Sequence, residues 1–375
     1  MSGIYIHIPF CKKHCNYCDF YSETNIKSHS SLINSIVKEI YLRKDYLPEK
    51  KIQTIYFGGG TPSLLKKEDF ETIFESIKQV YTIVENAEIT FEANPDDLTK
   101  EYLSSISPLP FNRISIGIQS FSDHYLGLLN RRHTKAEAIL AINNAKEAGF
   151  KNISIDLMYG LPYQTLEGWE EELNSALKTG VQHISAYGLT YEEGTVLWKL
   201  RENGRIKTVD DDIINEMYQT LLEKVEKSGF EAYETSNFAL LGYRSRHNSS
   251  YWKQKPYIGL GPSAHSYDGK SRQWNIDSIS KYIKAISENT VPAEREELSL
   301  FEKYNDFILV SLRTAEGIDL NELETKFGTE LKTYCLENIK TFIENKKVCK
   351  KNNTIYLNTE GMLISNLILT ELMKV

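Results

Sequence analysis

Residues 5–18 read YIHIPFCKKHCNYC and place three cysteines within eight positions, directly after a short apolar run that predicts a β-strand. Cys11, Cys15 and Cys18 have the spacing C-x3-C-x2-C. Thiolates this close in sequence can converge on one metal centre when the loop folds around it. A four-iron cubane held by three cysteines keeps one iron open to an exogenous ligand, whereas a structural zinc ion needs a fourth protein ligand. The spacing therefore favours an iron–sulfur cluster, with a zinc site as the alternative.

The composition of the 375-residue chain, with 41% apolar and 25% charged residues, is typical of a soluble globular protein. Its net charge of −7 argues against nucleic acid as the main partner, because phosphate binding requires a concentrated basic surface. No apolar stretch is long enough to span a bilayer, and the N-terminus lacks the pattern of a signal peptide. We therefore expect a cytoplasmic protein without a transmembrane segment. Peripheral contact with a membrane is still compatible with this composition.

The first 190 residues alternate short β-branched or aromatic runs with longer helical patterns. The predicted strands are Gly3–Ile8, Ile52–Phe57, Glu88–Glu92, Arg113–Ile118, Asn152–Leu157 and His183–Leu189. Helical patterns between them include Ser31–Lys44, Lys67–Tyr81, Lys135–Ala148 and Trp169–Thr179. Six βα units in succession predict a parallel α/β sheet with helices outside it, either doubly wound or of the barrel type.

Special residues follow the carboxyl ends of five successive predicted strands. The cysteine loop comes first, and the others are the glycine run 58–62, Glu92, Gln119 and Asp156. Barrel enzymes build their sites at this end of their strands, whereas a doubly wound sheet concentrates its site near one switch point. The pattern therefore predicts an incomplete (β/α)6 barrel of the TIM type.

Beyond the barrel, assigned to residues 1–200, the sequence predicts two further parts. Residues 201–297 contain a helix and a tract rich in glycine and aromatic residues. Residues 298–375 predict three short helices and then two short strands, an order that resembles a winged-helix domain. This last part has 10 Lys and Arg against 11 Asp and Glu, so we expect a packing or lid domain and no nucleic-acid binding.

The cysteine spacing, with Tyr17 just before the last cysteine, resembles the signature of the radical S-adenosylmethionine (SAM) superfamily. Residues 5–10, YIHIPF, narrow the resemblance to the group that contains the oxygen-independent coproporphyrinogen III oxidases and the HemW-type heme chaperones. The resemblance covers nearly the whole chain. It implies a [4Fe–4S] cluster on Cys11, Cys15 and Cys18, whose open iron binds the methionine part of SAM.

The same resemblance implies which residues contact SAM. The expected set is Tyr5, Tyr17, Gly59, Gly60, Thr61, Glu92, Gln119, Arg131 and Asp156. Asp156 is a charged residue within an apolar strand, so a partner or ligand is expected beside it on physical grounds as well. Arg131 is preferred to Arg132 because Asn130-Arg131 fits the family pattern better. Tyr5 and Tyr17 could equally be core aromatic residues.

Three features separate the two branches of this group. The oxidases carry a fourth cysteine two residues after the third, whereas Asp19 and Phe20 follow Cys18 here; the oxidases also have a longer segment before the first cysteine. Residues 247–252, HNSSYW, resemble the HNxxYW motif of the HemW-type proteins. His247 is therefore expected to contact heme, with a structural loop histidine as the alternative.

The resemblance thus implies a heme chaperone that binds heme, a [4Fe–4S] cluster and SAM and delivers heme to target hemoproteins, with a reductant protein as a further partner. Whether the chain also turns over a substrate is left open, and no residue is assigned a catalytic role. One alternative is a radical SAM coproporphyrinogen III oxidase. Another is a zinc-stabilised barrel without radical chemistry.

Overall fold

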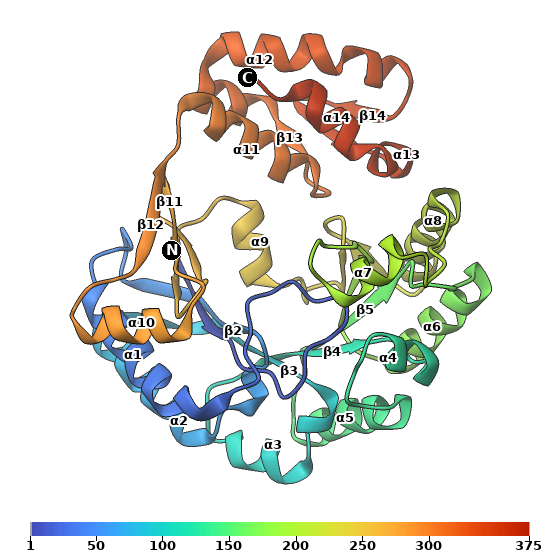
Figure 1. The fold of residues 1–375 in the computed structure, drawn as a ribbon. Coiled ribbons are helices and arrows are strands. Elements are labelled where there is room, and N and C mark those ends of the chain that lie inside the picture. Colours follow the sequence, from blue (N-terminus) through green and yellow to red (C-terminus); the bar gives the residue numbers. More distant parts are fainter. Residues whose placement is uncertain (1, 375) are drawn as a thin grey trace.

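The computed structural model describes residues 2–374. Its centre is a mixed sheet of twelve strands (Figure 1). Its strands lie in the order β12-β11-β10-β9-β1-β2-β3-β4-β5-β6-β8-β7. The six central parallel strands confirm the predicted βα units. These strands are β1 (Ser2–Ile8), β2 (Lys51–Gly59), β3 (Thr82–Ala93), β4 (Arg113–Gln119), β5 (Ile153–Tyr159) and β6 (His183–Gly188).

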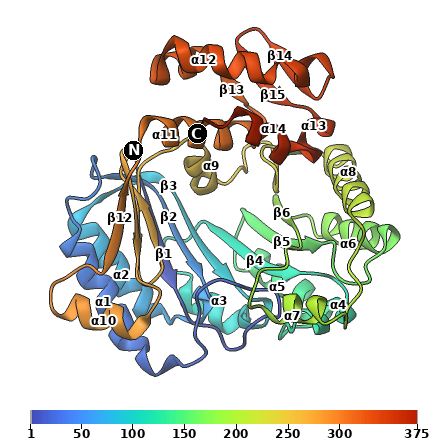
Figure 2. The same ribbon diagram turned by 45° about the horizontal axis from the view of Figure 1, so that its top comes forward.

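Helices cover the outer face of this sheet and leave its inner face open, so that the strands form an incomplete barrel (Figure 2). The longer helices are α1 (His29–Leu42), α2 (Lys67–Val80), α5 (Lys135–Glu147), α6 (Leu166–Lys178) and α8 (Asp211–Lys227). Short helices α3 (Lys100–Ile106), α4 (Asp123–Leu128) and α7 (Val196–Glu202) lie in the connections. Strand β3 starts six residues earlier than predicted, and its pairing with β2 has a register irregularity between Ile52 and Thr54.

Residues 201–297 extend both edges of the sheet and share the core of the barrel. Strand β9 (Tyr257–Leu260) pairs in parallel with β1, and β10 (His265–Tyr267), β11 (Ser271–Asn275) and β12 (Ala293–Glu297) follow it as antiparallel strands. At the other edge, β8 (Asn237–Leu240) and β7 (Phe230–Ala232) are antiparallel to β6. Helix α10 (Ile279–Ser287) packs on α1.

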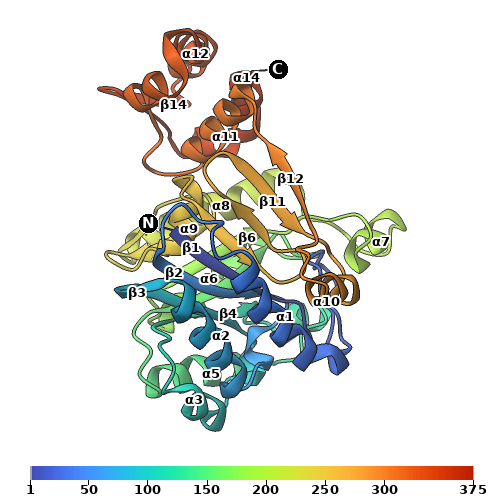
Figure 3. The same cartoon turned by 90° about the vertical axis from the view of Figure 1, so that its left-hand side faces the viewer.

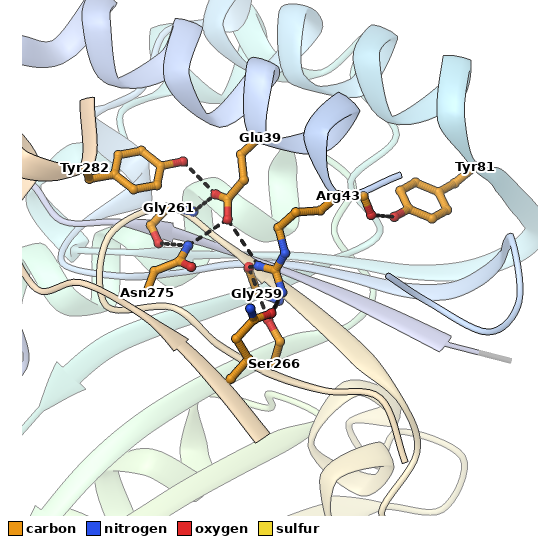
Figure 4. Close-up of polar contacts among 9 residues, drawn as sticks. Glu39, Arg43, Tyr81, Gly259, Gly261, Ser266, Asn275 and Tyr282 are labelled. Carbon is orange, nitrogen blue, oxygen red and sulfur yellow. Dashed lines mark hydrogen bonds and ion pairs between the residues drawn. The ribbon is translucent and has the colours of Figure 1, made fainter. Parts of the chain in front are cut away.

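A largely buried polar network connects this extension to α1 (Figure 4). The Glu39 carboxylate accepts hydrogen bonds from Arg43 Nη1 at 3.1 Å, Asn275 Nδ2 at 2.7 Å, Tyr282 Oη at 2.6 Å and the Gly261 amide at 2.8 Å. Arg43 also donates to the Gly259 carbonyl oxygen and to the side chains of Ser266 and Gln273. Both charges are thus compensated, as buried ions must be.

Helix α9 (Arg246–Trp252) closes the barrel at the amino ends of its strands, and Figure 2 shows it between these strands and the C-terminal domain. The Glu88 carboxylate, at 6% exposure, accepts hydrogen bonds from the amides of Arg246 and His247, both at 2.9 Å. A carboxylate is favourable there because the first amides of a helix lack partners within the helix. The helix is thereby held against β3.

The C-terminal domain has a separate hydrophobic core and lies above the barrel in Figure 3, and the Thr235 amide donates to the Arg313 carbonyl oxygen between the two. Its elements are α11 (Leu300–Leu312), β13 (Ile318–Asp319), α12 (Leu320–Glu344), β14 (Val348–Lys351), β15 (Thr354–Leu357), α13 (Thr359–Leu363) and α14 (Ser365–Leu372). Two of the three short helices predicted in this domain, near Leu320–Phe327 and Leu331–Asn345, are the halves of α12, which breaks at Gly328, where φ is +86°. No helix among residues 2–374 has both the length and the apolar character needed to cross a bilayer.

Candidate functional site

A cavity of about 450 Å³ lies at the carboxyl ends of the barrel strands, where the cysteine loop covers them. Its volume is in the range of small-molecule sites. Eleven of the thirteen residues assigned to a site from the sequence line it: Cys11, Cys15, Tyr17, Cys18, Gly59, Gly60, Thr61, Glu92, Gln119, Arg131 and Asp156. They come from four strands and three loops, and the parallel arrangement of the strands brings them together.

The three cysteines present free, partly exposed thiols to this cavity. Arg131 Nη1 donates to Cys15 Sγ at 3.2 Å, and Thr61 Oγ1 donates to Cys11 Sγ at 3.5 Å. Burial raises the pKa of the Cys18 thiol to about 11, so a metal that binds there displaces a proton.

The donor set fits a cubane, in which each cysteine holds a different iron. Within residues 2–374 no three His, Cys, Asp or Glu side chains are close enough to share one ion.

Asp97 ties the cysteine loop to the rest of the barrel. Its carboxylate, 4% exposed, accepts hydrogen bonds from Lys12 Nζ at 2.6 Å, Ser63 Oγ at 2.9 Å and Arg132 Nη2 at 3.0 Å. Arg132 also pairs with Asp96 at 2.8 Å. Arg132 therefore pairs with these two carboxylates outside the cavity, whereas Arg131 points toward Cys15.

Glu92 lies at the end of β3, and its carboxylate is held in place from two sides. Tyr56 Oη donates to Oε1 at 2.7 Å, and the Gly59 amide donates to Oε2 at 3.2 Å. Burial raises the pKa of this carboxyl to about 7; the two hydrogen bonds oppose the rise, and the negative charge of Asp156 adds to it. Glu92 and Asp156 thus form an acidic wall, and Ser115 Oγ donates to Asp156 Oδ1 at 3.3 Å.

Two backbone features shape the cavity floor. Gln119 has a φ of +70°, which is unusual for a residue with a side chain, and the β4–β5 pairing shifts register between Gly117 and Gln119. Residues with a strained backbone are common at functional sites. Gln119 is the last residue of β4, and it lines the cavity. Gly59, with a φ of +106°, lies so close to the His7 ring that a Cβ there would be 2.6 Å from it.

The structure does not bring Tyr5 or His247 to this cavity. The Tyr5 hydroxyl hydrogen-bonds with His7 Nδ1 at 3.0 Å, and its ring stacks on Tyr56 inside the barrel. Contact of Tyr5 with SAM stays a prediction.

His247 is 2% exposed and both of its ring nitrogens are occupied, since Nδ1 hydrogen-bonds with Thr54 and Nε2 with Tyr251, each at 2.8 Å. Burial lowers the pKa of the His247 imidazole to about 3, so the ring is neutral. It also stacks on Tyr56 with 4.9 Å between ring centroids. Contact of His247 with heme stays a prediction; in this structure both ring nitrogens are hydrogen-bonded and the ring packs at the amino end of the barrel.

Several cavity residues escaped the sequence reasoning, among them Asn94, Phe20 and Tyr187. Asn94 accepts a hydrogen bond from Arg131 Nη2 at 2.5 Å. It stands two residues after Glu92, at the same strand end, which is the signal that could have identified it. Phe20 is 70% exposed and Tyr187 43% exposed, so aromatic surface borders the cavity.

The comparisons with known proteins agree with this geometry. The radical SAM superfamily model matches residues 5–176, and the model of the HemN C-terminal domain matches residues 298–364. Heme chaperone HemW of Bacillus subtilis is 34% identical over 370 residues, which cover 98% of this chain and 97% of the relative. The chain belongs to the HemW family of radical SAM proteins. Membership in the superfamily implies that it binds a [4Fe–4S] cluster and SAM.

Two further relatives and one solved structure extend the comparison. Heme chaperone HemW of Buchnera aphidicola is 39% identical over 283 residues, covering 74% of this chain and 72% of the relative. The mitochondrial radical S-adenosyl methionine domain-containing protein 1 of Danio rerio is 32% identical, covering 84% and 74%. The structure of coproporphyrinogen III oxidase (HemN) from Escherichia coli, 21% identical, covers 100% of this chain and 90% of HemN with a TM-score of 0.85. It confirms the fold, a radical SAM barrel with a small C-terminal domain.

The raised pKa of Glu92 predicts that Glu92→Gln stabilises the chain without cofactors at alkaline pH. Because the folded protein binds this proton more tightly than the unfolded chain, the stability it contributes is full below about pH 4.5 and is lost as the pH rises through 7. The neutral amide avoids that loss, and the shift corresponds to about 3 kcal/mol. Urea unfolding at pH 5 and pH 8 should show the gain mainly at pH 8. Glu171→Gln, an exposed carboxylate on α6, is the control, and an equal gain at both pH values would contradict the prediction.

Proposed function

We propose that this protein is a cytoplasmic heme chaperone, which binds heme and delivers it to target hemoproteins. The observation that carries the proposal is the relationship to Bacillus subtilis HemW along 98% of the chain, which includes both the barrel and the C-terminal domain. The absence of a cysteine two positions after Cys18 supports this branch over the oxidases.

In this proposal the cavity would hold the cluster and SAM. Cys11, Cys15 and Cys18 would bind the cluster, which would supply reducing electrons to SAM. Glu92 and Asp156 offer acceptors for the hydroxyl and amino groups of SAM. Arg131 would pair with a carboxylate while its second nitrogen keeps its bond to Asn94. The glycine run lets the ligand approach the backbone closely.

Heme titration and an oxidase assay of the reconstituted protein test the proposal together. We expect saturable heme binding, followed by transfer of the heme to an apo-hemoprotein. With SAM and a reductant present, coproporphyrinogen III should remain unconverted. Formation of protoporphyrinogen IX would establish the oxidase reaction instead, and failure to bind heme would reject the chaperone function.

A further inference from the structure

Arg113, the first residue of β4, is buried inside the barrel without a direct partner. It is 1% exposed, and its Nε atom lacks a hydrogen-bond acceptor. Among residues 2–374, no carboxylate forms an ion pair with its guanidinium, and no oxygen accepts a hydrogen bond from it. A buried cation is costly unless an opposite charge compensates it. The compensating charge must therefore come from carboxylates at a longer distance.

The strand register places Arg113 in the layer below the acidic wall of Glu92 and Asp156. Arg113 on β4 pairs with Thr90 on β3, and two positions further on Ser115 pairs with Glu92. Ser115 donates to Asp156, so this face of β4 points into the barrel. Arg113 shares the face because residues two apart on a strand point to the same side, and its backbone lies about 7 Å from that of Ser115.

The charge of Arg113 reaches both carboxyls of the acidic wall. Burial raises the pKa of Glu92 to about 7 and also raises that of Asp156, and the positive charge of Arg113 opposes the rise at both. In the described part of the chain, the other titratable or charged side chains that face these carboxyls are Tyr5 on β1, Tyr56 on β2, Arg131 after α4, Tyr187 on β6 and Tyr251 on α9. Arg131 is the second cation, and it donates to Cys15 Sγ.

The remaining ionisable groups near Arg113 do not compensate its charge. Burial and the charge of Arg113 lower the pKa of His247 to about 3 and lower that of His183 well below its usual value, so both rings are neutral. The Glu88 carboxylate accepts hydrogen bonds from the first amides of α9. The charge of Arg113 therefore acts mainly on the acidic wall.

We propose that Arg113 is a positioning residue of the SAM site, which acts through Glu92 and Asp156 because its buried charge keeps them in the ionised form. The inference rests on the proposed function, in which these two carboxylates bind SAM. Only the ionised form offers both oxygens as hydrogen-bond acceptors, since a protonated carboxyl carries a donor on one of them. Arg113 forms no ion pair among the described residues, so the oxygens stay available to the ligand.

SAM binding by the reconstituted full-length variant Arg113→Met tests this role, measured by equilibrium dialysis from pH 5 to pH 9. In the wild type, the affinity should rise as the pH passes the pKa of Glu92, about 7. In Arg113→Met the rise should occur about one pH unit higher, so that the affinity at neutral pH falls by up to about tenfold. Methionine is also long and unbranched, and the exchange leaves no described acceptor without its donor, so the variant should fold.

Two further variants separate charge from shape. Arg113→Lys keeps the charge and should return the midpoint of the pH profile toward the wild-type value. Arg113→Gln is neutral and should shift the midpoint as Arg113→Met does, and it replaces that variant if methionine prevents folding. The matched control is Arg295→Met on β12, which removes the same charge from a side chain that is 55% exposed. Its SAM affinity should equal that of the wild type at every pH.

A second measurement uses the chain without cofactors. Infrared absorption of protonated carboxyls should show the same upward shift for Glu92 in the neutral variants, with Glu92→Gln identifying its signal. An affinity loss of equal size at every pH would indicate a structural role and overturn the inference. Wild-type binding in both neutral variants would also overturn it and leave the SAM site in place. If the wild type binds no SAM, the site fails together with the role of Arg113, whereas heme titration still decides the chaperone function.

Discussion

Cys15→Ser should leave the reconstituted protein almost free of iron, whereas the wild type should hold about four irons per chain. Cys15 is the middle cysteine of the loop, and its sulfur accepts a hydrogen bond from Arg131. A serine hydroxyl does not ionise at neutral pH and cannot replace this ligand. Anaerobic reconstitution with iron and sulfide, followed by metal analysis and absorption spectroscopy, measures the effect.

The matched control is Cys349→Ser, which removes a free, partly exposed thiol from β14 in the C-terminal domain. Its iron content and absorption should match the wild type. Full iron loading in Cys15→Ser would contradict the assignment of the cluster. A colourless wild type with a single zinc ion would contradict the cluster altogether and support the zinc-stabilised barrel.

The barrel could be predicted because its signals are local. Alternating strands and helices, together with special residues at five strand ends, specify both the parallel order and the end that bears the site. The cysteine loop, Glu92, Gln119 and Asp156 meet there for the same reason. The bounds of β3 were less accurate because the exposed residues Glu85 and Asn86 interrupt its apolar pattern between Val84 and Ala87.

The position of His247 could not be predicted, because it depends on contacts between distant parts of the chain. Thr54 and Tyr56 on β2, and Glu88 on β3, place α9 at the amino end of the barrel. Nothing in HNSSYW indicates which face of the helix is buried. Asp97 was missed for a related reason, since its partners Lys12 and Arg132 are far from it in sequence.

Glu39→Ala should reduce the free energy of unfolding by about 3–5 kcal/mol. The substitution leaves the Arg43 guanidinium, whose side chain is 5% exposed, without its carboxylate partner Glu39 (Figure 4). It also removes the acceptor of the Gly261 amide and of Asn275 and Tyr282. These groups join α1 to the strands β9–β11 and to α10, so the loss should affect the global unfolding transition. Urea unfolding without cofactors is the measurement.

The chain offers a control pair with the same spacing and nearly the same geometry. Glu223 and Lys227 on α8 are also four residues apart, with 3.2 Å between charged atoms against 3.1 Å for Glu39 and Arg43. Their side chains are 68% and 75% exposed, so Glu223→Ala should cost about 0.5 kcal/mol or less.

A double-mutant cycle at the buried pair should be strongly non-additive, because Glu39→Ala/Arg43→Ala removes both charges. The other polar groups would still lack partners, so the double variant should recover only part of the loss. Equal effects at the buried and exposed pairs would show that solvent reaches Glu39 and that the network does not hold the extension to the barrel.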